Sequence, residues 1–363
     1  MSRRSRANFL FFISLSALGL FTAMFFNIRA TLFAENYLTD GFTSNVDWVY
    51  SLDLLIGGTA GMAFMIIESR RLQMKRIWIL VLVGFVTAFA FAFPLFLALR
   101  ERHLAKQALA GGRIDTYEFD GHRVDVWVPK SLNPETPVLV MHDGHNLFLP
   151  EHATYGTTWG LLEAMPKRIK TENKPLIVGV WQGRSDDRVL ELGPEDFFTE
   201  NPAAISKIAQ HMLPREGYSK MGNAYQALIA EKVLPVLADL YAIKLTPERT
   251  AIAGSSMGGL ASLYGITKYP NVYGTALAYS THWPHAGAEL VDWFVKNLPM
   301  DGKHRVWSDT GTIELDAEYA PFHDRLVERM PKENFQPAIY PMTGHSESWW
   351  AGRVEHPINW WLS

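Results

Sequence analysis

The sequence predicts an α/β fold, a mostly parallel sheet that begins with an antiparallel hairpin, preceded by three transmembrane helices. Three observations lead to this prediction. Long apolar segments fill the first hundred residues, a hairpin signal follows at Asp120-Gly121, and apolar strands then alternate with helical patterns. We expect a membrane region over residues 1–106 and a globular domain over residues 107–363.

Composition excludes several classes of protein. Lys and Arg number 34 against 37 Asp and Glu, a net charge of −3, so nothing in the charge favours nucleic-acid binding. Cysteine is absent, which excludes a disulfide scaffold, a cysteine nucleophile and a thiolate metal site. The absence of cysteine suits the cytosol and the periplasm equally.

Three apolar segments are long enough to cross a lipid bilayer. They are Phe9–Ile28, Trp48–Ile67 and Ile77–Leu99. About 20 apolar residues of helix span a hydrocarbon core of roughly 30 Å. The first segment follows three arginines, as in a cleaved signal peptide, but it exceeds the roughly 7–15 apolar residues of such peptides. Asp53, inside the second segment, is either a functional group or close enough to the interface to stay hydrated.

Basic residues predict the orientation of this region. They gather before the first segment and in the second loop, at Arg3, Arg4, Arg6, Arg70, Arg71, Lys75 and Arg76. The first loop, residues 29–47, holds only Arg29 beside three acidic residues. The positive-inside rule then places the N-terminus in the cytoplasm, and three crossings deliver the globular domain to the periplasm. Three basic residues after the third segment argue against this orientation: Arg100, Arg102 and Lys106.

The globular domain reads as a hairpin followed by strand and helix alternation. The strands "RIDTYEF" and "RVDVWVP" flank Asp120-Gly121. Buried-type strands follow at "PVLVMHD", "PLIVGVW", "RTAIAGS", "GTALAYS", "HRVWSDT" and "PAIYPM". Helical patterns lie between several of them, notably Asn223–Ala242. This order predicts a mostly parallel sheet with helices on both faces.

A candidate nucleophile lies in "AIAGSSMGGLASLYG", where a strand turns sharply into a helix. Gly-x-Ser-x-Gly suits such a turn because Ser256 would adopt strained backbone angles close to both elements, and Gly254 and Gly258 carry no side chain. The helix N-terminus would favour developing negative charge. A tight structural turn is the alternative, and the spacing makes Ser255 less suitable.

A serine nucleophile needs a base, and the base needs an orienting carboxylate. In α/β-hydrolases the order is Ser, acid, His. "TGHSESWW" places His345 in a loop before the final helix, which makes it the expected base. The acid is expected in "VWSDTGTIELDAEY", with Asp316 ranked before Glu314 and Asp309. Asp316 could instead cap the helix that follows it.

The oxyanion donors are expected to be two backbone amides. One belongs to Met257, and the other to His145 in "HDGHNLF". His142, Asp143 and His145 could also be metal ligands, but no further clustered ligand completes a site. We therefore expect neither a metal nor a cofactor.

These motifs resemble those of the broad putative-esterase family. The similarity covers residues 115–363 through "MHDGHNLF", "GSSMGG", "DTGTIELDAEYAPF" and "GHSESWWAGR". The family includes feruloyl esterases, enterochelin-type siderophore esterases, S-formylglutathione hydrolases and mycobacterial mycolyltransferases. The resemblance implies an α/β-hydrolase fold, no metal, and Ser256 and His345 as nucleophile and base. It also puts Arg184 and Arg188 near the substrate, unless their segment is a solvated loop.

The first hundred residues resemble a three-span bacterial membrane module of unknown function. The similarity rests on "SLDLLIGG", "ESRRLQMKR" and "FAFPLFLALRE". It implies an architecture and no activity. We expect the protein to be an integral protein of a bacterial inner membrane.

The sequence thus predicts a membrane-anchored serine esterase that forms an acyl-enzyme on Ser256. Its expected partners are the lipid bilayer and a small-molecule, glycan or siderophore ester. Two alternatives stay open. The same acyl-enzyme could transfer its acyl group to a sugar or lipid, or the fold could be a catalytically idle binding or sensing module.

Overall fold

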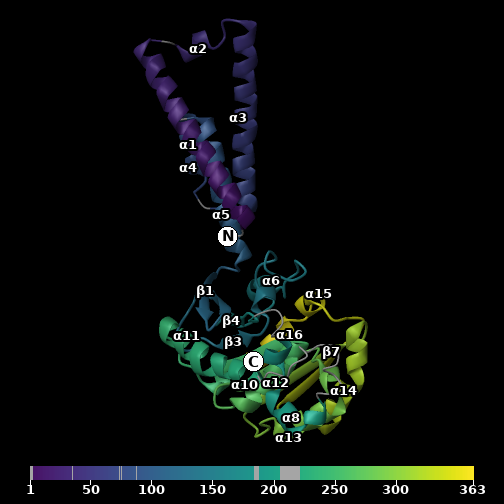
Figure 1. Cartoon of the computed structure of the whole chain (residues 1–363). Coiled ribbons are helices and arrows are strands. Elements are labelled where there is room, and N and C mark those ends of the chain that lie inside the picture. The colour runs from purple at the N-terminus through teal and green to yellow at the C-terminus, as the bar shows by residue number, and fades with distance from the viewer. Residues whose placement is uncertain are drawn as a thin grey trace. The chain divides into compact units, whose positions relative to one another are not determined.

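The computed structural model describes residues 3–34, 36–72, 74, 76–86, 88–183, 188–204 and 221–363. Two residues used in the sequence-based predictions lie outside these ranges: Lys75, one of the basic residues that predicted the orientation, and Arg184, expected near the substrate. The chain divides into two compact units, residues 1–108 and 109–363, which run from purple to blue and from blue to yellow in Figure 1.

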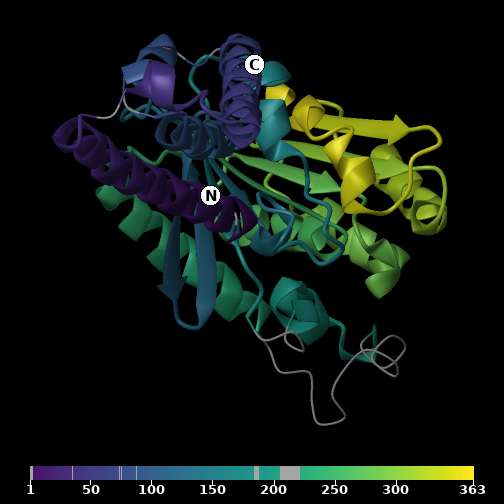
Figure 2. The same ribbon diagram turned by 90° about the horizontal axis from the view of Figure 1, so that it is seen from above.

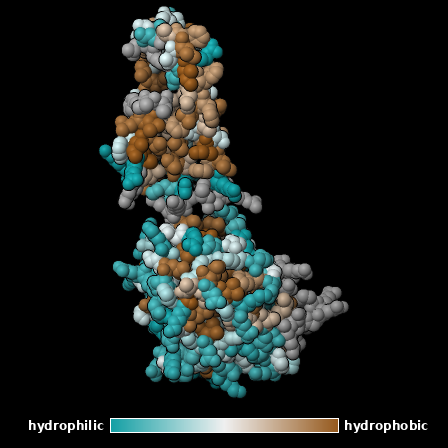
Figure 3. Space-filling model, turned by 90° about the vertical axis from the view of Figure 1, so that its left-hand side faces the viewer, coloured by the Kyte–Doolittle hydropathy of each residue, from teal (hydrophilic) through white to brown (hydrophobic). Residues whose placement is uncertain are grey.

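The first unit is helical. Its helices are α1 (Arg3–Leu32), α2 (Tyr37–Asp40), α3 (Asn45–Arg71), α4 (Trp78–Val86) and α5 (Phe89–Ala108). Within the described residues, two helices are long and apolar enough to cross a membrane, over Arg6–Leu32 and Asn45–Arg71. Large apolar side chains cover their surface, with Phe21 of α1 71% exposed and Ile56 of α3 69% exposed (Figure 3). Such a surface is unfavourable in water and suits a hydrocarbon environment.

The third predicted span, Ile77–Leu99, is two helices and not one. α4 has nine residues, about 13 Å of helix, which is too short for a bilayer core. α5 begins at Phe89 and packs back against α4, so that a Cβ at Gly84 would lie 3.1 Å from the Cβ of Ala92. The two therefore form a helical hairpin. Hydropathy measures only how apolar a segment is, so it did not reveal that the chain reverses within it.

The open end of this hairpin lies at the end of α3. Arg100 Nε of α5 is 2.8 Å from Oε1 of Glu68, in the last turn of α3. Nε2 of His103 is 2.8 Å from the carbonyl oxygen of Leu72, directly after α3. The later part of α5 thus lies beside the C-terminal end of α3, where the chain leads into α4.

The tip of the hairpin lies near the middle of both long helices. The ring of Phe89 occupies the space that a Cβ at Gly61 of α3 would need. Ser16 Oγ of α1 donates to the carbonyl oxygen of Phe91 at 3.0 Å. The hairpin therefore extends about half of the way along α1 and α3 before it reverses.

The second unit is built on one eight-stranded sheet. Its strands are β1 (Arg113–Phe119), β2 (His122–Val128), β3 (Val138–Met141), β4 (Leu176–Val180), β5 (Thr250–Ser255), β6 (Thr275–Tyr279), β7 (Arg305–Gly311) and β8 (Phe335–Tyr340). The order is β1-β2-β4-β3-β5-β6-β7-β8. β2 pairs antiparallel with β1 and β4, and all other pairs are parallel. The predicted mostly parallel sheet with its N-terminal hairpin is confirmed.

Helices cover both faces of this sheet (Figure 2). They are α6 (Leu161–Lys167), α7 (Arg188–Leu192), α8 (Glu195–Glu200), α10 (Gly222–Ala227), α11 (Leu234–Tyr241), α12 (Met257–Lys268), α13 (Ala288–Asn297), α14 (Leu315–Arg329), α15 (Glu347–Ala351) and α16 (Glu355–Trp361). Alternate residues of β3 enter two different cores. Val138 and Val140 pack with residues of α10 to α14, whereas Leu139 and Met141 pack with residues of α6, α15 and α16. The continuous apolar strands are thus explained by burial on both faces.

Candidate active site

Ser256 occupies the sharp turn between β5 and α12. Its φ of 56° and ψ of −121° are unfavourable for a residue with a side chain. Neighbouring backbone holds it there, because its amide donates to Tyr279 at 3.0 Å and its carbonyl accepts from His282 at 3.1 Å. A Cβ at Gly254 would lie 2.7 Å from the carbonyl oxygen of Gly258. The glycine spacing of the motif is therefore a packing requirement of the turn.

Ser256 opens into a pocket of about 430 Å³ at the C-terminal ends of the strands. The pocket is also lined by His345, His145 and the ion pair of Asp143 with Arg188. Ser255 belongs to β5 and is only 4% exposed, while Ser256 is half-buried at the pocket wall. Ser256 and His345, the predicted nucleophile and base, are far apart in sequence. The structure brings both of them to one cavity.

The imidazole of His345 is bound to the carboxylate of Asp316. His345 Nδ1 lies 2.6 Å from Asp316 Oδ1. The other oxygen of this buried carboxylate accepts from Ser280 Oγ at 2.6 Å and from the Gly311 amide at 2.7 Å. Burial acts to raise the pKa of Asp316, but the hydrogen bonds from His345 and Ser280 outweigh it and hold the pKa below its ordinary value. An ionised Asp316 can only accept, so Nδ1 donates and Nε2 is free to take a proton.

The two other candidate acids have different contacts. Glu314 accepts from the backbone amide of His345 at 3.2 Å, so it holds the loop. Asp309 accepts from Arg353 at 3.0 Å and from Trp307 at 3.1 Å. Burial raises the pKa of Asp309. Among the three, the imidazole is bonded to Asp316.

A second layer of residues, not predicted from the sequence, surrounds this pair. The buried guanidinium of Arg353 donates to Ser280 Oγ at 2.7 Å as well as to Asp309. The hydroxyl of Tyr319 is 2.5 Å from Nδ1 of His282. Tyr319 lies one helical turn after Asp316 on α14, a spacing that would have placed both on one face.

The two predicted oxyanion residues lie beside the pocket. Met257 is the first residue of α12, and His145 lies in the short 3₁₀ turn Gly144–Asn146. Among the described residues, the backbone amides of Met257 and His145 donate no hydrogen bond. A Cβ at Gly144 would lie 2.5 Å from the backbone of Gly179 in β4, so glycine permits this turn to pack on the sheet.

The residues considered as metal ligands have protein partners. Nδ1 of His142 lies 2.8 Å from the Tyr225 hydroxyl, and burial lowers the pKa of His142 to about 4. Arg188 binds both oxygens of Asp143, at 2.7 and 2.6 Å. The guanidinium predicted to meet an anionic substrate is therefore already paired with a carboxylate.

Acyl transfer can be performed by the groups that meet here: a hydroxyl at a strained turn, an imidazole with a free Nε2, a buried carboxylate and two amides. The geometry thus has the chemical groups of a serine hydrolase. Comparison with known proteins places it in a family.

Residues 120–355, well over half of the chain, match the family described as putative esterase. Residues 11–102 match a family described as a protein of unknown function, DUF2834. The uncharacterized protein YbbA of Bacillus subtilis is 22% identical over 210 residues, which cover 56% of this chain and 73% of that protein.

Among solved structures, the enterobactin esterase of Shigella flexneri in the presence of enterobactin has a TM-score of 0.50 and 16% identity. The match covers 69% of this chain and 58% of that chain, less than two thirds of its length. A ferulic acid esterase has a TM-score of 0.48 and 14% identity, with 69% of this chain and 96% of that chain covered. At these identities the enterobactin esterase shows a shared fold alone. From the sequence match over residues 120–355, this chain belongs to the putative esterase family.

Proposed function

We propose that this protein is a membrane-anchored serine esterase with Ser256 as nucleophile, His345 as base and Asp316 as the orienting acid. The observation that carries the proposal is the 2.6 Å bond between His345 and Asp316 in a pocket shared with Ser256. Membership of the esterase family supports the same reaction class.

In the proposed mechanism, Nε2 of His345 takes the proton of Ser256 as its oxygen attacks the ester carbonyl carbon. The amides of Met257 and His145 stabilise the oxyanion of the tetrahedral intermediate. His345 then gives its proton to the leaving alcohol, and an acyl-enzyme remains on Ser256. Water, deprotonated by His345, then attacks the acyl carbon; the bond to Oγ of Ser256 breaks, His345 returns the proton to Oγ, and the acid is released.

We propose a small polar ester as the substrate. The pocket of about 430 Å³ has charged walls, Asp143 with Arg188 and Glu347, next to the aromatic rings of Trp159 and Trp350. The enterobactin esterase that shares the fold was solved with enterobactin. A siderophore ester is therefore the first substrate class to test.

The activity is tested with the full chain in detergent, by labelling with a fluorophosphonate probe and by hydrolysis of p-nitrophenyl esters. Ser256→Ala should abolish labelling and lower turnover by about 10⁶, because it removes the nucleophile. Ser255→Ala, one position away in β5, should leave both nearly unchanged. Equal losses in the two variants would contradict the assignment of Ser256.

We also propose that the esterase domain lies on the cytoplasmic side. The predicted periplasmic location counted three crossings, but α4 and α5 form a hairpin that returns to the Glu68 end of α3. Figure 1 shows that the start of α1 and the end of α3 lie at the same end of the first unit. Arg100 and Arg102, which opposed a periplasmic domain, then share one side with Arg70 and Arg71, as the positive-inside rule favours.

Reporter fusions in a bacterial host test this orientation. Alkaline phosphatase, active only in the periplasm, should be inactive after Met74 and after Ser363 and active after Phe42, in the loop between α1 and α3. Green fluorescent protein should give the reverse pattern. Activity of the phosphatase after Ser363 but not after Met74 would restore the third crossing and a periplasmic domain.

A further inference from the structure

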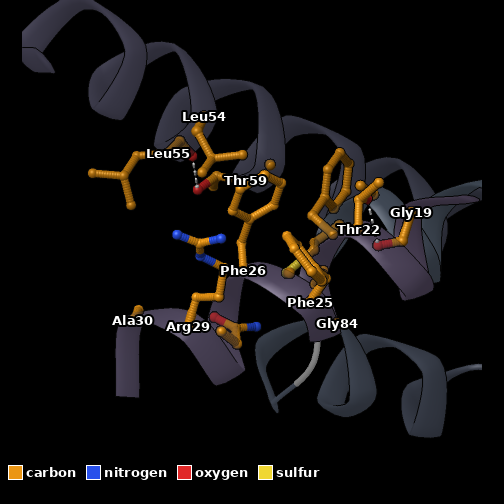
Figure 4. Close-up of a pocket in the computed structure, with 17 residues that line it drawn as sticks. Gly19, Thr22, Phe25, Phe26, Arg29, Ala30, Leu54, Leu55, Thr59 and Gly84 are labelled. Atoms are coloured by element: carbon orange, nitrogen blue, oxygen red, sulfur yellow. Dashed lines mark hydrogen bonds between the residues drawn. The ribbon is translucent and has the colours of Figure 1, made fainter. Parts of the chain in front are cut away.

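A large apolar cavity lies in the membrane unit between α1, α3 and the tip of the hairpin. Its volume is about 1170 Å³. α1 contributes Phe26 and Thr22, α3 contributes Leu54 and Met62, and the hairpin contributes Phe89 (Figure 4). The esterase pocket is in the other unit, so this cavity is a separate site.

The cavity exists because the hairpin extends only halfway along the long helices. Phe89 packs at Gly61 of α3, and Ala90 approaches Gly19 of α1. Beyond this level α1 and α3 have no third helix between them within the described part of the unit, and the lining residues of α1 continue from Gly19 to Ala30. A continuous third span would have filled this space.

Most of the residues that line the cavity are apolar, and the polar ones are Thr22, Thr59, Asn27 and Arg29. Thr22 Oγ1 donates to the carbonyl oxygen of Leu18 at 2.8 Å, and Thr59 Oγ1 donates to that of Leu55 at 2.6 Å. Both hydroxyls are thus satisfied within their own helices. A water held in such a place would need two to four polar partners. The lining therefore suits hydrocarbon rather than water.

One charged side chain faces this apolar space. Arg29, in the last turn of α1, lines the cavity, and Figure 4 shows its guanidinium extending toward Leu55 of α3. The guanidinium lies 5.8 Å from the ring centroid of Phe25 and 5.4 Å from that of Phe33. No ion pair among the described residues includes Arg29. Arg29 follows directly after the apolar segment Phe9–Ile28, where a cation can reach the interface and meet an anionic headgroup.

We propose that this cavity binds an anionic phospholipid, with an acyl chain between α1 and α3 and the headgroup phosphate at Arg29. The apolar lining accounts for the acyl chain, and the guanidinium of Arg29, which has no ion pair among the described residues, accounts for the headgroup charge. Along α1, Arg29 and the tip of the hairpin are separated by about half the thickness of a bilayer. The lipid therefore belongs to the leaflet opposite the end of the unit at which Glu68 and Arg100 form their ion pair. The site is independent of the esterase chemistry.

Native mass spectrometry of the full chain in neutral detergent tests the headgroup contact. The probes are phosphatidylglycerol and phosphatidylcholine with identical acyl chains. The wild type should bind phosphatidylglycerol about fivefold more tightly, the effect of one cation near an anionic lipid. Arg29→Gln should bind the two lipids equally. Arg6→Gln, at the exposed opposite end of the same helix, should keep the preference.

A second pair of variants tests the chain-binding space. Thr22→Trp would place an indole in the cavity and should reduce binding of both lipids. The control is Thr31→Trp. Thr31 is also on α1 and its hydroxyl also donates to the preceding turn, but it lies outside the cavity, so this variant should leave binding unchanged. Unchanged resistance to trypsin at Arg70 and Arg71 in the same detergent reports that the helices of this unit are folded in each variant.

Three results would overturn the lipid site. The first is equal binding of both lipids by the wild type. The second is the same loss of preference in Arg6→Gln and Arg29→Gln. The third is a dimer in the wild type that Thr22→Trp converts to a monomer, because a second copy of the chain would then fill the cavity.

Discussion

The two units of this chain place their large apolar side chains in opposite environments. Phe21 and Ile56 of the membrane unit are 71% and 69% exposed, whereas Leu139 and Leu277 of the esterase unit are fully buried. The same residue types therefore stabilise the two units against different solvents. In the first unit, residues 1–108, they lie on a surface that suits hydrocarbon, and in the esterase unit they leave water for a packed core.

Polar contacts differ between the units in the same way. The membrane unit holds its hairpin through a few contacts, such as Glu68 with Arg100. The esterase unit buries a connected network in which Arg353 and Asp309 surround Ser280, and Ser280 donates to Asp316. Buried charges need such partners, so the esterase unit should be the more sensitive to loss of a single polar group.

The largest expected effect concerns the acid of the esterase unit. Asp316→Asn should lower turnover by about 10⁴, because the amide does not hold the imidazole in the correct tautomer or stabilise its charged form. Glu314→Gln, which alters only a contact to the His345 backbone, should lose tenfold or less. Steady-state hydrolysis of a p-nitrophenyl ester measures both. A Glu314→Gln loss as large as that of Asp316→Asn would reverse the ranking of the acids.

The next effect compares a buried ion pair with an exposed one. Arg353→Met should destabilise the esterase unit by about 3–5 kcal/mol, because it leaves Asp309 buried without its cation. The control is Arg325→Met, since Arg325 and Asp292 are both 37% exposed. It should cost no more than about 1 kcal/mol. Urea unfolding followed by tryptophan fluorescence measures the difference, and similar midpoints for the two variants would refute it.

A glycine substitution extends the comparison to the membrane unit. Gly61→Val should destabilise the hairpin by about 1–3 kcal/mol, because its side chain would overlap the ring of Phe89. Gly57→Val, where a Cβ would meet no atom within 4 Å, is the matched control. The rate of tryptic cleavage at Arg70 and Arg71 in detergent reports hairpin opening. Ester hydrolysis should not change in either variant, and a parallel loss of activity would show that the units are coupled.

The smallest expected effect is a pH dependence of the esterase unit. Burial lowers the pKa of His142 from 6.5 to about 4. Between these values the unfolded chain binds a proton that the folded chain does not, so stability present above pH 6.5 is lost as the pH falls toward 4. The loss from His142 between pH 7 and pH 5 should be about 2 kcal/mol. Urea midpoints at pH 7 and pH 5 measure it, and His142→Asn should reduce the difference. An unchanged difference in that variant would assign it to other groups, such as His282 and His285.

The organisation of the esterase unit could be predicted from local sequence patterns. Asp120-Gly121 indicated the hairpin because a tight turn needs residues that tolerate positive φ, and their φ values are 48° and 85°. Ser256 was indicated by its flanking glycines, which the packing of the turn requires. His345 was indicated by its loop position after the last strand. Each of these features depends on neighbours in sequence, so a short segment carries the signal.

Tertiary contacts decided the remaining features. Asp309, Glu314 and Asp316 lie within one short segment, and only folding brings one of their carboxylates to the imidazole of His345. In the first unit, hydropathy predicted apolar helices but not that α4 and α5 pack against each other as a hairpin. Composition and periodicity therefore determined which segments are apolar and form helices or strands. The partners and directions of those segments were decided by contacts between residues far apart in sequence, because side-chain geometry and chain reversal are properties of the packed structure.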